Sequence, residues 1–492
     1  ALSKELERLK QQFEEMKQKD EAKEKRITVV EKKAEQAVKE AGHLSWLEIG
    51  GDYRGRYDYL KGTVHEHFLL FPTGKTTPEG LPIFKAYEPG NMVQKYDVKN
   101  DSLLTNRLGL NLKVKATEDI NVKARLLMYK VWGHQTETPI QGAFFADRAM
   151  GVFDGSIGHV PSGSELIVDQ AYATWSNIGG APVWFSVGRR PSTGGIPGTL
   201  RQNLEKTGTA GVPSFLVDYA FDGLTFGVAP DIEALPGAYA KICYGKGFDS
   251  GFRNLAGNTV KDVQMLGLNL VPYDTHNLHI EAQFNRAFSI FDNMPDAGVR
   301  TNLGDIDQYG LLVMGKIDNA GAGDLNLFVA GAISKTHPNN NMYRFNADFT
   351  AVVGGLSMDT GAGLLYDNPD MGGVRKSRTG NIIYLGARYD IKSTGTKIGV
   401  EYNRGSKYWI AFAPAADDMW TSKLGTRGDV WETYIIQELK LKPIAPRGKA
   451  FFRLGYQYYD FKYTGSNSWL GEPKKISELR ATDSKKAKMF QQ

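Results

Sequence analysis

Residues 49–59 read IGGDYRGRYDY, and this run alternates between two kinds of side chain. Its odd positions are apolar, aromatic or glycine, and its even positions after Gly50 are charged. Because successive side chains of a β-strand point to opposite faces, the run predicts a strand with one apolar and one charged face. In a soluble sandwich the apolar face would cover a core, whereas in a membrane barrel it would face lipid and the charged face would line water.

The same period of two recurs along the chain and predicts fifteen strands. Several of them span 12–15 residues, more than the roughly 5–6 residues usual in globular proteins, and this length suits tilted strands that cross a bilayer. The predicted strands cover residues 46–60, 102–116, 119–133, 166–177, 182–190, 222–230, 237–247, 260–272, 277–290, 305–318, 323–335, 379–391, 395–405, 428–442 and 447–462.

The connections between these strands alternate in length. Short connections at 117–118, 177–181, 229–236, 272–277, 318–322, 392–394 and 442–448 separate long ones at 61–101, 134–165, 191–221, 248–259, 291–304, 336–378 and 406–427. Short periplasmic turns and long external loops are typical of outer-membrane barrels. The first connection is long, so the first strand is expected to run outward from the periplasm.

Residues 44–492 are therefore expected to form an all-β transmembrane antiparallel barrel of about 16 strands. Bacterial barrels close with an even number of strands, which places a sixteenth strand within residues 476–492. A further hairpin within residues 345–365 would raise the number to 18. A soluble β-protein with a helical stalk is the alternative fold.

Residues 1–43 show a different period, because apolar side chains recur every 3.5 residues from Leu2 to Ala41. Nearly six heptads at this spacing predict an α-helical coiled coil that ends at Gly42. No second heptad segment is visible in the chain, so a homo-oligomer joined through this periplasmic stalk is expected. The expected seam contains Leu2, Leu6, Leu9, Phe13, Met16, Ile27 and Val30.

The composition and short motifs exclude several functions. A net charge of +5 over 492 residues and a single cysteine, Cys243, do not indicate nucleic-acid binding, a disulfide framework or a thiolate metal cluster. The sequence contains no Gly-x-Ser-x-Gly, Walker or His-Glu-x-x-His motif. We expect no enzyme activity, metal or cofactor, although an outer-membrane hydrolase needs few residues and stays an alternative.

Three short segments resemble segments of Gram-negative general porins: residues 169–172 (DQAY), 187–191 (VGRRP) and 222–226 (DGLTF). Architecturally the chain is similar to porin-like outer-membrane proteins that carry an N-terminal coiled coil. This resemblance implies a trimer of 16-stranded barrels, surrounded by outer-membrane lipid and lipopolysaccharide. The C-terminus departs from the family pattern, because Phe490 and not the last residue is aromatic.

The alternation also predicts which charged side chains line the interior. Acidic candidates are fewer (Asp52, Asp58, Glu281, Asp390 and Glu401), so a pore for small hydrophilic solutes that favours anions is expected. The basic candidates are Arg54, Arg56, Arg107, Lys113, Lys115, Lys123, Arg125, Arg190, Arg388 and Arg453.

Three further interpretations complete the sequence hypothesis. Acidic residues of the loops at 61–101 and 336–378 could face the basic side chains, or these charges could only keep the interior wet. Tryptophans near strand ends, Trp409 among them, are expected at the membrane interface. A structural tether, in which residues 1–43 bind the cell wall, is the alternative function.

Overall fold

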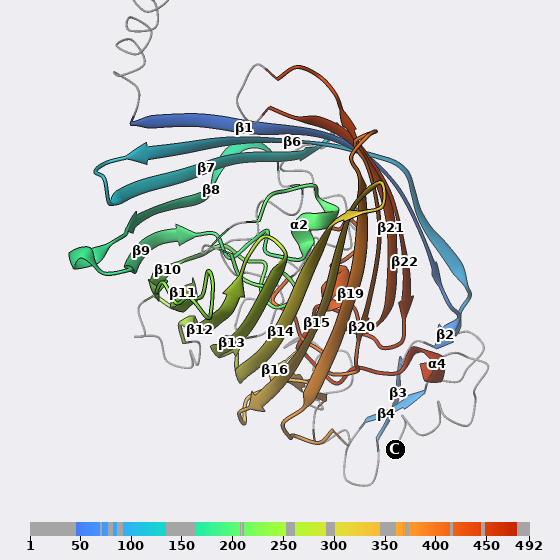
Figure 1. The fold of residues 1–492 in the computed structure, drawn as a ribbon. Coiled ribbons are helices and arrows are strands. Elements are labelled where there is room, and N and C mark those ends of the chain that lie inside the picture. Colours follow the sequence, from blue (N-terminus) through green and yellow to red (C-terminus); the bar gives the residue numbers. More distant parts are fainter. Residues whose placement is uncertain are drawn as a thin grey trace, which may run out of the picture.

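The computed structural model describes residues 46–68, 71–76, 82–85, 92–133, 161, 163–206, 208, 211–251, 261–291, 301–344, 361–367, 369, 373–413, 417–443 and 448–479. Fifteen antiparallel strands form one sheet, in which each strand pairs with the next one along the chain that belongs to the sheet. The sheet curves around an interior that other segments occupy, and β1 and β22 are its two edges (Figure 1).

All fifteen predicted strands are confirmed, with boundaries shifted by a few residues at most ends. The boundaries of the first two strands differ most from the prediction, because both strands extend further into the first loop than the alternation indicated. The strands are β1 (Leu47–Val64), β6 (Tyr96–Lys115), β7 (Ile120–Val131), β8 (Gly163–Trp175), β9 (Val183–Arg190), β10 (Phe221–Val228), β11 (Tyr239–Phe248), β12 (Val263–Asp274), β13 (Leu278–Phe291), β14 (Asn302–Ala320), β15 (Gly323–Pro338), β19 (Thr379–Ile391), β20 (Thr396–Gly405), β21 (Gly428–Leu439) and β22 (Ala450–Phe461).

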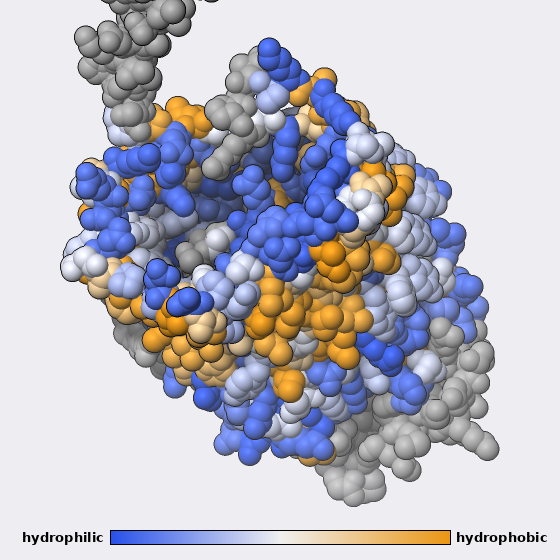
Figure 2. All heavy atoms as spheres, in the orientation of Figure 1, coloured by the Kyte–Doolittle hydropathy of each residue, from blue (hydrophilic) through white to orange (hydrophobic). Residues whose placement is uncertain are grey.

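The outer face of the sheet is apolar, and its inner face carries polar and charged side chains together with buried apolar residues such as Ile306 and Phe328. On β12, Leu266, Leu268 and Leu270 are 40%, 50% and 51% exposed, while Asn269 between them is completely buried. Figure 2 shows a hydrophobic patch over the region of β12 to β15. A soluble protein would bury such a face, so this arrangement is the inverse of a soluble β-sandwich.

The alternation of short and long connections is also confirmed. Asn319, the second-last residue of β14, adopts a left-handed φ of 54° just before the tight turn to β15. Short connections join every second pair of strands. Parts of the long connections form three small sheets: β2 (His67–Phe68) with β5 (Met92–Val93), β3 (Phe71–Thr76) with β4 (Pro82–Lys85), and β16 (Tyr343–Arg344) with β17 (Gly361–Gly363) and β18 (Tyr366–Asp367).

Closure of the sheet differs from the expectation in the part of the chain that is described. There, no backbone pairing joins β1 to β22. Of the residues expected to contain a sixteenth strand, Ile476–Leu479 form the short helix α4, and 480–492 lie outside the described residues. Most of the expected extra hairpin at 345–365 lies outside the described residues, and β17 pairs within the small sheet. The expected coiled coil at 1–43, with its seam residues, also lies outside the described residues.

Helical structure in the described ranges is sparse. The helix α2 (Gly198–Arg201) lies inside the curved sheet, and the 3-10 segments η4 (Ile178–Gly180) and η7 (Lys423–Gly425) each span one turn. None of the helices in those ranges is long and apolar enough to span a bilayer.

Candidate functional site

Two long connections fold into the interior of the sheet, and we call residues 191–220 and 406–427 the inner loops. They pair with each other through a parallel bridge between Val217 and Phe412, in which Phe412 donates its N–H to the Leu216 carbonyl at 2.8 Å. Gln308 on β14 donates from Nε2 to the carbonyl of Ile410 at 3.0 Å. The inner loops are therefore fixed to the wall and to each other.

An apolar cluster packs the inner loops against β12 to β20. Phe215, Leu216 and Trp409 are completely buried in it, with Phe328 and Tyr384 from the wall. Burial of each large side chain stabilises this packing by about 1.5–3 kcal/mol. One side of the interior is consequently filled, and the charged side, along β1 and β6 to β9, is the remaining candidate for a solute path.

That charged side carries the predicted basic residues of the first strands, which we call the basic wall: Arg54, Arg56, Arg107, Lys113, Lys115, Lys123, Arg125 and Arg190. The basic wall contacts an inner loop through Arg54, which donates to both carboxylate oxygens of Asp417, with Nη2–Oδ1 at 2.8 Å. Arg56 adds a hydrogen bond from Nη1 to the Asp417 carbonyl at 2.8 Å. Burial opposes ionisation of Asp417, but the charge of Arg54 and its hydrogen bonds outweigh burial and hold the pKa of Asp417 below its usual range.

Most of the ten predicted pore-lining residues have a carboxylate partner within 4.0 Å. Asp52 serves two of them, since it lies 2.7 Å from Arg125 and 3.6 Å from Arg107. Glu48 likewise lies 2.9 Å from Lys113 and 3.7 Å from Lys115. The remaining pairs are Arg54 with Asp417, Arg56 with Asp58, Arg388 with Asp390, and Arg453 with Glu432.

Lys123 and Arg190 are different, because neither forms an ion pair with a carboxylate among the described residues. They meet at Tyr172: Lys123 is its register partner across β7 and β8, and the Arg190 guanidinium lies 5.6 Å from the centre of its ring. The Nη1 atom of Arg190 is buried without a hydrogen-bond partner in the described part of the chain. Positive charge is thus least compensated at this point of the basic wall.

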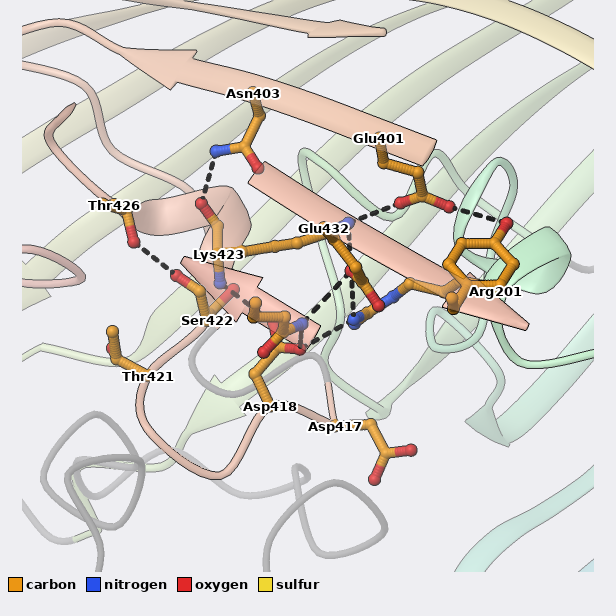
Figure 3. A network of polar contacts seen from close by, with 12 residues as sticks. Arg201, Glu401, Asn403, Asp417, Asp418, Thr421, Ser422, Lys423, Thr426 and Glu432 are labelled. Carbon is orange, nitrogen blue, oxygen red and sulfur yellow. Dashed lines mark hydrogen bonds and ion pairs between the residues drawn. The ribbon is translucent and has the colours of Figure 1, made fainter. Parts of the chain in front are cut away.

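A buried ionic network fixes the inner loops to β20, β21 and β22 (Figure 3). The Lys423 ammonium lies between the carboxylates of Glu401 and Glu432, 2.6 Å from Glu432, and all three side chains are 1% exposed. Arg201 of α2 reaches Asp418 at 2.7 Å and Glu432 at 3.1 Å. Burial disfavours the charge of Arg201, but these carboxylates outweigh it and raise the pKa of Arg201 well above its usual value.

The structure bears on two sequence interpretations. The loop that brings a carboxylate to the basic wall is 406–427, through Asp417, whereas Asp97 pairs with Lys61 and Asp367 with Lys474. The other acidic residues that the loops at 61–101 and 336–378 could bring to the wall, Glu79, Glu88, Asp348, Asp359 and Asp370, lie outside the described residues, so that interpretation stays a prediction for them. Trp409 is completely buried in the interior, so its expected place at the membrane interface is wrong.

Sequence reasoning missed Lys423, Arg427 and Trp409 as organisers of the interior. Arg427 is 1% exposed and donates to the carbonyl oxygens of Trp409 at 3.1 Å, Gly465 at 2.7 Å and Ser468 at 2.6 Å. The apolar run at 408–413 (YWIAFA) inside a long connection could have indicated a buried loop. A solvent-exposed loop rarely carries six consecutive apolar or aromatic residues.

The interior opens on the face shown in Figure 2, where a recess below β1 and β6 is bordered largely by hydrophilic residues. No group of three or more potential ligands in the described ranges is arranged to hold a metal ion.

Comparison with solved structures finds several similar chains. Similar solved structures include OmpF of Salmonella typhi in complex with daunomycin, 9% identical, covering 87% of this chain and 94% of that chain with a TM-score of 0.39. OmpT of Vibrio cholerae in its trimer form is 13% identical over 86% of this chain and 95% of that one, with a TM-score of 0.36. A mutant of the Rh. blastica porin is 9% identical over 80% of this chain and 89% of that one, with a TM-score of 0.33.

No curated protein matches the sequence. A family model does match it over residues 97–492, which include β7 to β22 and all of β6 except its first residue. The chain therefore belongs to the family described as "Protein of unknown function (DUF3373)".

Proposed function

We propose that this protein is an outer-membrane pore through which small hydrophilic solutes diffuse. The observation that carries the proposal is the inverted distribution of side chains on the large sheet: large apolar side chains are exposed on its outer face, and charged side chains line its inner face beside the apolar cluster. The apolar outer face suits contact with a lipid bilayer, and the charged inner face suits a water-filled interior. Inner loops that are fixed to the wall would narrow such an interior without closing its charged side.

We further propose that the pore favours anions, and that Lys123 and Arg190 determine this preference. Eight of the ten predicted basic residues have an acidic partner within 4.0 Å, so their fields are largely cancelled. The two without such a partner would contribute most of the net potential along the path. Ionic strength should weaken the preference, because salt screens exposed charges over about 10 Å at 0.1 M.

The assembly proposed is a closed barrel of about 16 strands in a homotrimer, as the porin resemblance of the sequence implies, with residues 1–43 in the periplasm. A tether to the cell wall through those residues is the second candidate function, favoured by their heptads. Binding of purified peptidoglycan by the full-length chain, but not by a chain that lacks residues 1–43, would support it.

The pore is tested by reconstituting the purified protein into liposomes and following swelling in a small neutral sugar. Swelling that depends on the protein is expected, and it should slow as the sugar becomes larger. Liposomes that contain the folded protein but do not swell would contradict the proposal.

A further inference from the structure

The two edge strands of the large sheet, β1 and β22, are bridged from the inside by residues 417–423. On the β1 side, Arg54 donates to the carboxylate of Asp417, with Nη2–Oδ1 at 2.8 Å. Arg56 donates to the backbone carbonyl oxygen of Asp417, also at 2.8 Å. Arg54 and Asp417 are 363 residues apart in sequence. Their side chains are 26% and 6% exposed, so water screens this pair only partly.

Apolar contacts reinforce the same side. Met419 is 1% exposed and packs with Tyr129 of β7 and Leu103 of β6. The Trp420 ring lies directly over Gly62 of β1, where a Cβ atom would come within 2.3 Å of the ring. Glycine at this position therefore lets the strand approach the loop closely.

Adjacent residues of the same segment contact β22. Gln457 donates from Nε2 to the Asp418 carboxylate at 2.8 Å, and Tyr459 donates its hydroxyl to the carbonyl of Thr421 at 2.9 Å. Lys423 then anchors the segment to β20 and β21 through Glu401 and Glu432. One short stretch of chain is consequently bonded to the first strands and the last strands of the sheet.

We propose that residues 417–423 act as a clasp that holds β1 beside β22. Among the described residues the two edges share no backbone pairing, whereas hydrogen bonds of this segment reach both of them. The inference does not depend on the pore function, because a clasp would close the sheet whether or not solutes pass.

The test measures the separation of the two edges directly. Spin labels are placed at Tyr57→Cys on β1 and Tyr458→Cys on β22, which are 61% and 52% exposed, in full-length protein that also carries Cys243→Ser. A reference pair at Leu224→Cys and Leu268→Cys reports on β10 and β12, far from the clasp in the order of the sheet. Distances between labels are measured by pulsed electron paramagnetic resonance in lipid vesicles.

Asp417→Asn should lengthen and broaden the distance distribution of the edge pair and leave the reference pair unchanged. Asp97→Asn is the matched control, because Asp97 pairs with Lys61 of β1 at the surface, where the Asp97 side chain is 46% exposed. This control should change the distance distribution of neither label pair. If Asp417→Asn does not fold, Gln457→Ala with Tyr459→Phe removes contacts on the other side and should give the same broadening. An unchanged edge distribution in a folded clasp variant would overturn the inference.

Discussion

Replacing Lys423 with methionine tests the buried ionic network most severely. In the wild-type network three cations, Arg201, Lys423 and Arg453, face the three carboxylates of Asp418, Glu401 and Glu432. Methionine keeps an unbranched apolar side chain but removes the charge, which leaves Glu401 and Glu432 buried with one negative charge uncompensated. Breaking a buried pair in this way costs about 3–5 kcal/mol.

The free energy of unfolding can be measured by urea titration in lipid vesicles, followed by tryptophan fluorescence. Lys462→Met is the matched control, because Lys462 pairs with Asp460 at the surface, where the two side chains are 46% and 42% exposed. An exposed pair contributes only about 0.2–1 kcal/mol. We expect Lys423→Met to lower the free energy of unfolding by about 3–5 kcal/mol and the control by under about 1 kcal/mol. Equal losses in the two variants would refute the reasoning.

Three other changes probe the clasp and the basic wall. Gly62→Ala should lower the thermal midpoint of the folded, fast-migrating form on SDS gels, because its Cβ would overlap Trp420, whereas Gly55→Ala, which meets nothing within 4 Å, should not; equal midpoints would argue against close packing at Gly62. Lys123→Gln with Arg190→Gln should move the reversal potential toward cation selectivity, and Lys113→Gln, which loses a charge already paired with Glu48, should move it less; the opposite ranking would reject the assignment. The lowered pKa of Asp417 means that its stabilising contribution is complete above the unfolded pKa near 4 and is lost as the pH falls through the folded value. The midpoint difference between wild type and Asp417→Asn should therefore stay constant from about pH 8 to pH 5 and shrink only below about pH 4, and a difference that disappears by pH 6 would contradict this.

The strands could be predicted from sequence because their signal is local. A residue such as Tyr53 shows its outward direction by alternating with Asp52 and Arg54, and the inverted faces of the sheet follow from the same period. Each large-sheet strand also pairs with its neighbours in chain order, so no long-range information is needed to place it. The turn lengths supplied the remaining constraint.

The interior could not be predicted because its contacts join distant parts of the chain. Nothing near Arg54 in the sequence indicates Asp417, and Arg201 lies 217 residues from Asp418. Alternation gives the face of a strand residue, but a loop residue such as Lys423 or Trp409 has no period to follow. The expected inward loops were selected by length, whereas the loop at 406–427 is fixed inside by its apolar run and its buried charges.

The measurement that tests the central claim most directly is single-channel conductance of the detergent-purified protein in a planar bilayer under a salt gradient. Discrete conductance steps with a reversal potential that favours anions are expected, and steps that arrive in threes would agree with a trimer. Protein that inserts without conducting would contradict the pore, and protein that stays in solution without detergent would contradict the membrane assignment itself.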